Sequence, residues 1–153
     1  MSEKFQILLP VYNEASSIRK TLFDIYEALK DKINFEFIIT EDGSTDNTKE
    51  ILNDLKQQLP MILISDDKRK YYSIAVLDGI KKDSSDCLLI MDSDGQCDTK
   101  DIMSFWHKRK ESDLVCGYRS HRYDVAYRRL VSKIFYLIYN ILFKVTWKDQ
   151  HFA

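Results

Sequence analysis

The sequence predicts an α/β protein with a mostly parallel sheet and helices on both of its faces. Short apolar runs typical of buried strands alternate along the chain with longer segments whose apolar residues recur at helical spacing. Clusters of Asp, Asn, Ser and Gly separate several of these segments. Such alternation is typical of parallel sheets, because parallel neighbours need a crossover connection between them.

Five apolar runs are the predicted strands. They are Phe5–Pro10, Phe35–Thr40, Met61–Ser65, the run that begins at Cys87, and Asp113–Gly117. Amphipathic segments between and after them are the predicted helices, at residues 18–29, 51–59, 73–82 and about 99–110. Asn47 and Glu50 have the spacing of a capping box, which predicts the start of the second helix.

Size and composition fit one folded domain, since the chain has 153 residues, of which 44% are hydrophobic and 31% charged. A net charge of -1 argues against nucleic acid as a partner, because nucleic-acid-binding proteins are normally strongly basic. Cys87, Cys97 and Cys116 are odd in number and lack C-x-x-C spacing. With no signal peptide apparent, they are expected to be reduced thiols of a cytoplasmic protein, with Cys87 and Cys116 in its core.

An acidic cluster follows the fourth predicted strand, in the stretch CLLIMDSDGQCD at residues 87–98. In an extended chain Asp92, Asp94 and Gln96 would share one face. Two carboxylates aimed at one point repel unless a cation lies between them, and oxygen ligands favour magnesium, manganese or calcium over zinc. The cluster therefore predicts a divalent-metal site at the carboxyl end of a strand, where parallel sheets bind their ligands. The alternative is that these residues only form a turn and a helix cap.

Four short motifs follow predicted strands in order: LLPVYNEASSI, TEDGSTDNT, MDSDGQ and CGYR. Together they resemble the family-2 glycosyltransferases, which have the GT-A fold, and within them the polyprenyl-phosphate sugar synthases. The resemblance extends from Ile7 to about Asp149. It implies a metal-dependent, inverting transfer of a sugar from a GDP- or UDP-sugar to a polyprenyl phosphate, at the cytosolic face of a membrane.

The resemblance also implies a role for individual residues. Those expected to bind the donor nucleotide are Pro10, Tyr12, Glu14, Thr40, Asp42, Asp92, Ser93, Asp94, Gln96 and Arg119. Asp92, Asp94 and Gln96 are expected to hold Mg²⁺ or Mn²⁺, and Arg119 to lie near the donor phosphates. The chemistry agrees, because a metal ion and an arginine stabilise the charge that builds on a departing nucleoside diphosphate.

The acceptor is expected to bind further along the chain, where Arg128 and Ser132 match an element that receives a lipid phosphate. Asp94, Arg119 and Arg128 are the expected catalytic residues. A phosphate acceptor is already an anionic nucleophile, so no general base is required. Residues 1–119 would then form the donor-binding part of one domain, and residues 120–153 the start of an acceptor-binding part that is expected to be incomplete.

The run Leu130–Trp147 is apolar and aromatic but interrupted by polar residues, so it is a poor candidate for a spanning helix. Packing in a core and contact with a membrane surface both fit it. If it is exposed, its apolar face favours association with a membrane or with a second copy as a homodimer.

Two departures from the family pattern stand out. Glu41 lies where an aspartate is usual, although Asp42 keeps its position. The stretch before the third helix reads KYYSIAV where glycines are usual, which leaves the identity of the nucleotide open.

Other functions fit less well. LLIMDSDGQ also resembles the first motif of haloacid-dehalogenase phosphatases, but the later acidic pair of that family is missing. An EF-hand loop is excluded because its sixth position is Cys97 rather than glycine. Sugar nucleotidyltransferases have a glycine-rich opening loop that this chain lacks. A glycosyltransferase with a saccharide acceptor, and a shortened relative that binds nucleotide or membrane without turnover, remain as alternatives.

Overall fold

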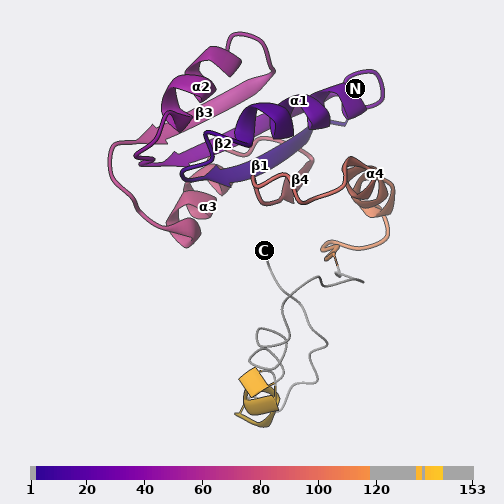
Figure 1. Ribbon diagram of the computed structural model, residues 1–153. Helices are drawn as coiled ribbons and strands as arrows, with labels where there is room; N and C mark the ends of the chain where they lie inside the picture. Colours follow the sequence, from indigo (N-terminus) through magenta and orange to yellow (C-terminus); the bar gives the residue numbers. More distant parts are fainter. Residues whose placement is uncertain (1–2, 118–133, 136, 143–153) are drawn as a thin grey trace. The chain divides into compact units, whose positions relative to one another are not determined.

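The computed structural model describes residues 3–117, 134–135 and 137–142 (Figure 1). The chain divides into two compact units, Met1–Glu111 and Ser112–Ala153. Of the residues to which the sequence assigned a role, Arg119, Arg128 and Ser132 lie outside the described residues.

The first unit is built on a sheet of four strands: β1 (Phe5–Val11), β2 (Phe35–Asp42), β3 (Met61–Asp66) and β4 (Cys87–Ile90). Their order is β3-β2-β1-β4, and each pair of neighbours is parallel. The chain thus builds outward from β1 to β3 and then returns to place β4 on the other side of β1. The parallel sheet that the sequence predicts is confirmed.

Four helices cover this sheet: α1 (Ile18–Leu29), α2 (Thr48–Leu55), α3 (Tyr72–Ile80) and α4 (Thr99–Lys108). Figure 1 shows α1 and α2 on one side of the sheet and α3 on the other. The predicted covering of both faces is therefore confirmed.

Alternation along β1 explains how both faces are filled. Ile7 and Leu9 belong to the main core cluster together with apolar residues of α1, α2 and α4. Leu8 points to the other face, where α3 packs so closely that a Cβ on Gly79 would lie 2.2 Å from Leu8 Cδ1. Gly79 is therefore the residue that lets α3 approach the sheet.

Two local expectations are wrong. Residues 113–117 form no strand, and Leu114 is 74% exposed. A short apolar run becomes a strand only where a neighbour pairs with its backbone, and within the described residues β4 pairs with β1 alone. Cys116 is accordingly exposed, so the expectation that it lies in the core is wrong. Cys87 is partly buried and packs against the core.

The second correction concerns the start of α2. Asn47 is its N-cap residue but makes no side-chain capping hydrogen bond. The Asp46 carboxylate takes that place, since its Oδ1 accepts from the Thr48 N–H at 3.1 Å. The predicted Asn47–Glu50 capping box is thus not formed.

In the second unit, the described residues between 134 and 142 are helical. Their large apolar side chains are all 51–70% exposed, namely Ile134, Phe135, Leu137, Ile138, Ile141 and Leu142. Over the described ranges, no helix is both long and apolar enough to cross a membrane.

Candidate functional site

The predicted site residues of the first unit gather where the strands end. Tyr12 follows β1, Asp42 ends β2, and Asp92 comes soon after β4. Since the strand order reverses between β1 and β4, a crevice for ligands is expected at the carboxyl ends of these two strands. The fold therefore brings the first, second and third motifs of the sequence to one edge of the sheet.

Hydrogen bonds join the loop after β1 to the loop after β2. The Asn13 side-chain oxygen accepts from the Thr45 N–H at 2.8 Å, and the Asn13 N–H donates to Ser44 Oγ at 3.0 Å. Asn13 has a φ of +55°, a conformation that asparagine tolerates better than most residues. The Ala15 N–H donates to Asp46 Oδ2 at 3.1 Å. The VYNEA and DGSTDNT segments are therefore one connected structure.

Glu14 also belongs to these connections. Its N–H donates to Thr48 Oγ1 at 2.9 Å, and its carboxylate accepts from the Ser17 hydroxyl. Part of the hydrogen-bonding capacity that the sequence assigned to a nucleotide thus stabilises the start of α1.

The two acidic residues at the end of β2 have different surroundings. Glu41 is buried, and its carboxylate accepts from Ser65 Oγ at 2.8 Å and lies 3.7 Å from Lys49 Nζ. A glutamate is long enough to reach Ser65 on the neighbouring strand β3, which gives a structural reason for this departure from the family pattern. Asp42 points to the loop before α3, where its Oδ1 accepts from the Lys70 N–H at 2.5 Å.

Thr40 lies one residue before this pair, between Pro10 of β1 and Ile64 of β3. Its hydroxyl is buried and has no hydrogen-bond partner among the described residues. An unpaired buried hydroxyl costs roughly 1–3 kcal/mol, so this group is a candidate for a partner that binds later.

The acidic stretch after β4 turns instead of continuing as a strand. Gly95 has a φ of +76°, and Asp94 Oδ1 accepts from the Gln96 N–H at 2.9 Å. Ser93 is buried, Asp92 is partly buried, and Asp94 and Gln96 are exposed. The expectation that Asp92, Asp94 and Gln96 project from one face of an extended chain is wrong, because the turn at residues 94–96 breaks the alternation.

A metal ion still fits these residues chemically. Within the part of the chain that the structure describes, no group of three or more His, Cys, Asp or Glu side chains forms a metal cage. Magnesium, however, is commonly held by one or two carboxylates together with phosphates of a substrate, and prefers oxygen ligands. Asp92 and Asp94 match that type of site better than a closed cage.

The start of α3 also reaches this region. Burial raises the pKa of the Tyr72 phenol, and the negative charge of Asp92 raises it further. The Tyr72 phenol therefore interacts electrostatically with Asp92, a relationship that the sequence did not suggest.

Sequence reasoning also missed Arg69. Its guanidinium carbon lies 3.9 Å from the centre of the Tyr12 ring and 4.9 Å from that of Tyr71. The only signal for it is the basic and aromatic stretch KRKYY before α3.

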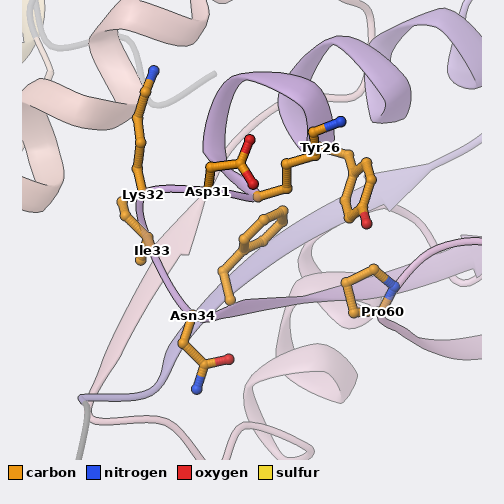
Figure 2. A pocket seen from close by; sticks show the side chains of 8 residues that line it. Tyr26, Asp31, Lys32, Ile33, Asn34 and Pro60 are labelled. Atoms are coloured by element: carbon orange, nitrogen blue, oxygen red, sulfur yellow. The ribbon is translucent and has the colours of Figure 1, made fainter.

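A surface pocket of about 490 Å³ lies at the opposite edge of the sheet, with Tyr26, Asn34 and Pro60 in its lining (Figure 2). This edge holds the start of β2 and the residue before β3. None of the motif residues lines it. The carboxyl edge is therefore the better candidate, because a parallel sheet binds its ligands there.

Comparison with known proteins identifies the family. The family model for glycosyl transferase family 2 matches residues 6–152. The chain belongs to this family. A dolichol-phosphate mannosyltransferase of Pyrococcus furiosus is 31% identical over a segment that covers 85% of this chain and 38% of that protein. An undecaprenyl-phosphate 4-deoxy-4-formamido-L-arabinose transferase of Yersinia pestis is 30% identical, with 86% of this chain and 42% of that protein covered.

The fold of glycosyl transferase family 2 is also found in a solved neighbour. A mannosyltransferase of Pyrobaculum calidifontis, PcManGT, in complex with GDP-Man and Mn²⁺, superposes with a TM-score of 0.64 at 23% identity. The superposition covers 78% of this chain and 36% of PcManGT. The predicted GT-A fold is thereby confirmed, and the chain spans about two fifths of the length of the relatives it matches.

Proposed function

We propose that this chain supplies the donor-binding part of a metal-dependent, inverting glycosyltransferase. The enzyme would move a sugar from a nucleotide-diphosphate sugar to a polyprenyl phosphate. The observation that carries the proposal is the meeting of Tyr12, Asp42 and the Asp92–Asp94 stretch at one edge of a parallel sheet. Membership of glycosyl transferase family 2 gives that edge its chemistry.

The donor nucleotide would bind across the ends of β1 and β2. Tyr12 offers a partly exposed ring on which a base can stack, and Asp42 offers a carboxylate that accepts N–H groups. Pro10, Glu14, Thr40 and Ser93 would complete the surroundings of the nucleotide. The nucleotide would be GDP or UDP, since solved neighbours with this fold are complexes with GDP-Man and with UDP.

Mg²⁺ or Mn²⁺ would be held by Asp92, Asp94 and Gln96. When bound, the ion supplies positive charge against the diphosphate that leaves. In the turn at residues 94–96, one carboxylate oxygen of Asp94 accepts from the Gln96 N–H, and the side chain is exposed, so its other oxygen is available to a metal ion. Arg119 would add a second positive charge near the donor phosphates.

The acceptor would be a polyprenyl phosphate bound through Arg128 and Ser132. The dolichol-phosphate and undecaprenyl-phosphate transferases among the relatives support this class of acceptor. A lipid acceptor places the enzyme at the cytosolic face of a membrane as a peripheral protein. The exposed apolar side chains at residues 134–142 fit a membrane surface or a second copy.

Titration of the chain with GDP, UDP and their sugars, each with and without Mn²⁺, tests the proposal. We expect binding that needs both the diphosphate and the metal, with AMP and inorganic sulfate as controls that do not bind. Transfer of a radiolabelled sugar to a polyprenyl phosphate, measured on the full-length protein, tests the acceptor. Failure of every nucleotide diphosphate to bind would refute the donor assignment.

A further inference from the structure

The loop before α3 contacts Tyr12 and Asp42, two residues that the proposed function assigns to the donor nucleotide. The planar guanidinium of Arg69 lies 3.9 Å from the centre of the Tyr12 ring, a stacking distance. The neighbouring Lys70 N–H donates to Asp42 Oδ1. A base that stacks on Tyr12 and donates an N–H to Asp42 would make the same two kinds of contact. Residues 68–71, the base-mimic loop, therefore imitate a bound base.

Close packing holds this loop against the end of β2. Gly43 has a φ of +69°, and a Cβ at this position would lie 2.6 Å from the backbone nitrogen of Arg69. A side chain at residue 43 would thus push the loop away from Asp42. The occupied arrangement depends on the glycine of the DGST segment as well as on the loop itself.

Backbone strain lies at the end of the loop, directly before α3. Tyr71 has a φ of +69° and a ψ of 158°, a region that is almost restricted to glycine. Its side chain is 66% exposed, so burial of the ring does not explain why the strain is tolerated. The Arg69 guanidinium, 4.9 Å from the centre of the Tyr71 ring, is what the strained residue contacts.

We propose that the base-mimic loop closes the nucleobase subsite in the nucleotide-free chain, and that Arg69 competes directly with the base of the donor. Binding would move the guanidinium off Tyr12 and free Asp42 from Lys70. This inference rests on the proposed function, because it assumes that the subsite takes a nucleoside diphosphate. Arg69 is then a determinant of nucleotide affinity and specificity, since a larger base must displace more of the loop.

The variant Arg69→Ala tests the competition. A contact between a cation and an exposed ring contributes roughly 0.5–1 kcal/mol, so loss of the Arg69 side chain should tighten UDP and GDP binding about two- to fivefold. Affinity for inorganic pyrophosphate with Mn²⁺, which has no base, should stay the same. Lys68→Ala is the matched control, since it removes a positive charge from the same loop; it should leave UDP and GDP binding unchanged or slightly weaker.

The sign of the effect separates the alternatives. Loss of a positive charge by itself weakens the binding of an anion, so tighter binding is explained only by competition. If Arg69→Ala weakens UDP, GDP and pyrophosphate alike, Arg69 is a phosphate ligand and the inference is wrong. Unchanged affinity for all three would equally refute it.

A second measurement does not depend on affinity. Stacking on tyrosine rings shifts the side-chain protons of Arg69 upfield in NMR spectra. This shift should be present in the free chain, disappear with saturating UDP or GDP and persist with pyrophosphate. A free chain without the shift would refute the closed loop. Failure of any nucleotide to bind, in both the wild type and Arg69→Ala, would instead refute the proposed function together with the competition.

Discussion

Asp42 at the end of β2 accepts a hydrogen bond from the backbone N–H of Lys70, 28 residues further along the chain. This bond joins a buried carboxylate of the candidate site to the loop that precedes α3. The side chain expected to recognise the nucleotide therefore also controls the position of the loop next to it. Substitutions in that loop should therefore alter nucleotide binding at the site. The backbone strain at Tyr71 can be measured separately, through the stability of the chain.

The folded chain should be more stable with glycine at position 71 than with alanine. At ordinary backbone angles alanine is the more stable of the two by about 0.4–1 kcal/mol. At a φ of +69° and ψ of 158° the order should reverse, because alanine keeps the strain and glycine removes it. Strain of about 1–3 kcal/mol less the advantage of alanine leaves Tyr71→Gly more stable than Tyr71→Ala by about 0.5–2.5 kcal/mol in the free energy of unfolding, measured with urea.

Both variants lose the tyrosine ring and its contact with Arg69, so the comparison isolates the backbone. Equal stability, or a more stable alanine variant, would mean that residue 71 does not hold a positive φ.

Much of this fold could be predicted because buried strands leave a strong pattern. Runs such as ILL at residues 7–9 are apolar on both faces, as a parallel strand covered by helices requires. The end of β2 was less predictable, since it continues through Glu41 and Asp42, two acidic residues that are buried with hydrogen-bond partners. Burial of charge depends on partners from other strands and loops, which no local pattern contains.

The sequence predicts which motifs gather at the candidate site, but it does not predict how their side chains are arranged. Asp92 and Asp94 were found by their position after an apolar run, but Gly95 bends the chain where alternation predicted an extended one. Arg69 could not be predicted, because its contact with Tyr12 joins loops that are distant in sequence and depends on an unusual conformation at Tyr71. The resemblance to the family pointed to glycines at this stretch, and the structure explains why tyrosine there is costly.

Stability in acid should depend on Asp46. Burial acts to raise the pKa of this carboxyl, but hydrogen bonds from Thr48 and Ala15 outweigh it and hold the pKa below the ordinary value of 3.8. A carboxyl with a lowered folded-state pKa adds stability above its unfolded pKa and loses it as the pH falls through the folded value. The difference in unfolding free energy between the wild type and Asp46→Asn should be constant from about pH 5 to 7 and shrink below about pH 4.

Urea denaturation at a series of pH values measures this difference. Thr48→Val removes one donor to Asp46 and should reduce the pH dependence in the same direction. A difference that stays constant down to pH 2 would show that the Asp46 charge does not stabilise the loops.

Thr40→Val should stabilise the nucleotide-free chain and weaken its binding of UDP and GDP. The Thr40 hydroxyl is buried without a hydrogen-bond partner in the described residues, and valine has nearly the same shape. Removal of an unpaired buried hydroxyl should add about 1 kcal/mol to the free energy of unfolding. Titration with UDP and GDP measures the second effect, because the hydroxyl would lose its contact with the bound nucleotide. Unchanged affinity for both would remove Thr40 from the nucleotide site.

Asp94→Asn should abolish the metal-dependent part of nucleotide binding and preserve the fold. An asparagine side-chain oxygen can still accept the hydrogen bond from the Gln96 N–H, so the turn at residues 94–96 is kept while the negative charge is lost. A divalent ion held by Asp92, Asp94 and the donor phosphates should then bind at least about tenfold more weakly. Titration with UDP and GDP at several Mn²⁺ concentrations measures the loss, and binding without metal should match the wild type.

Asp98→Asn is the matched control, because Asp98 lies four residues further on and caps α4 by accepting from the Lys100 N–H at 2.9 Å. That variant also loses one negative charge and keeps its hydrogen bond, yet it should retain the full Mn²⁺ dependence. Equal losses in the two variants would trace the effect to the general negative charge of the stretch, and full Mn²⁺ dependence in Asp94→Asn would remove Asp94 from the metal site.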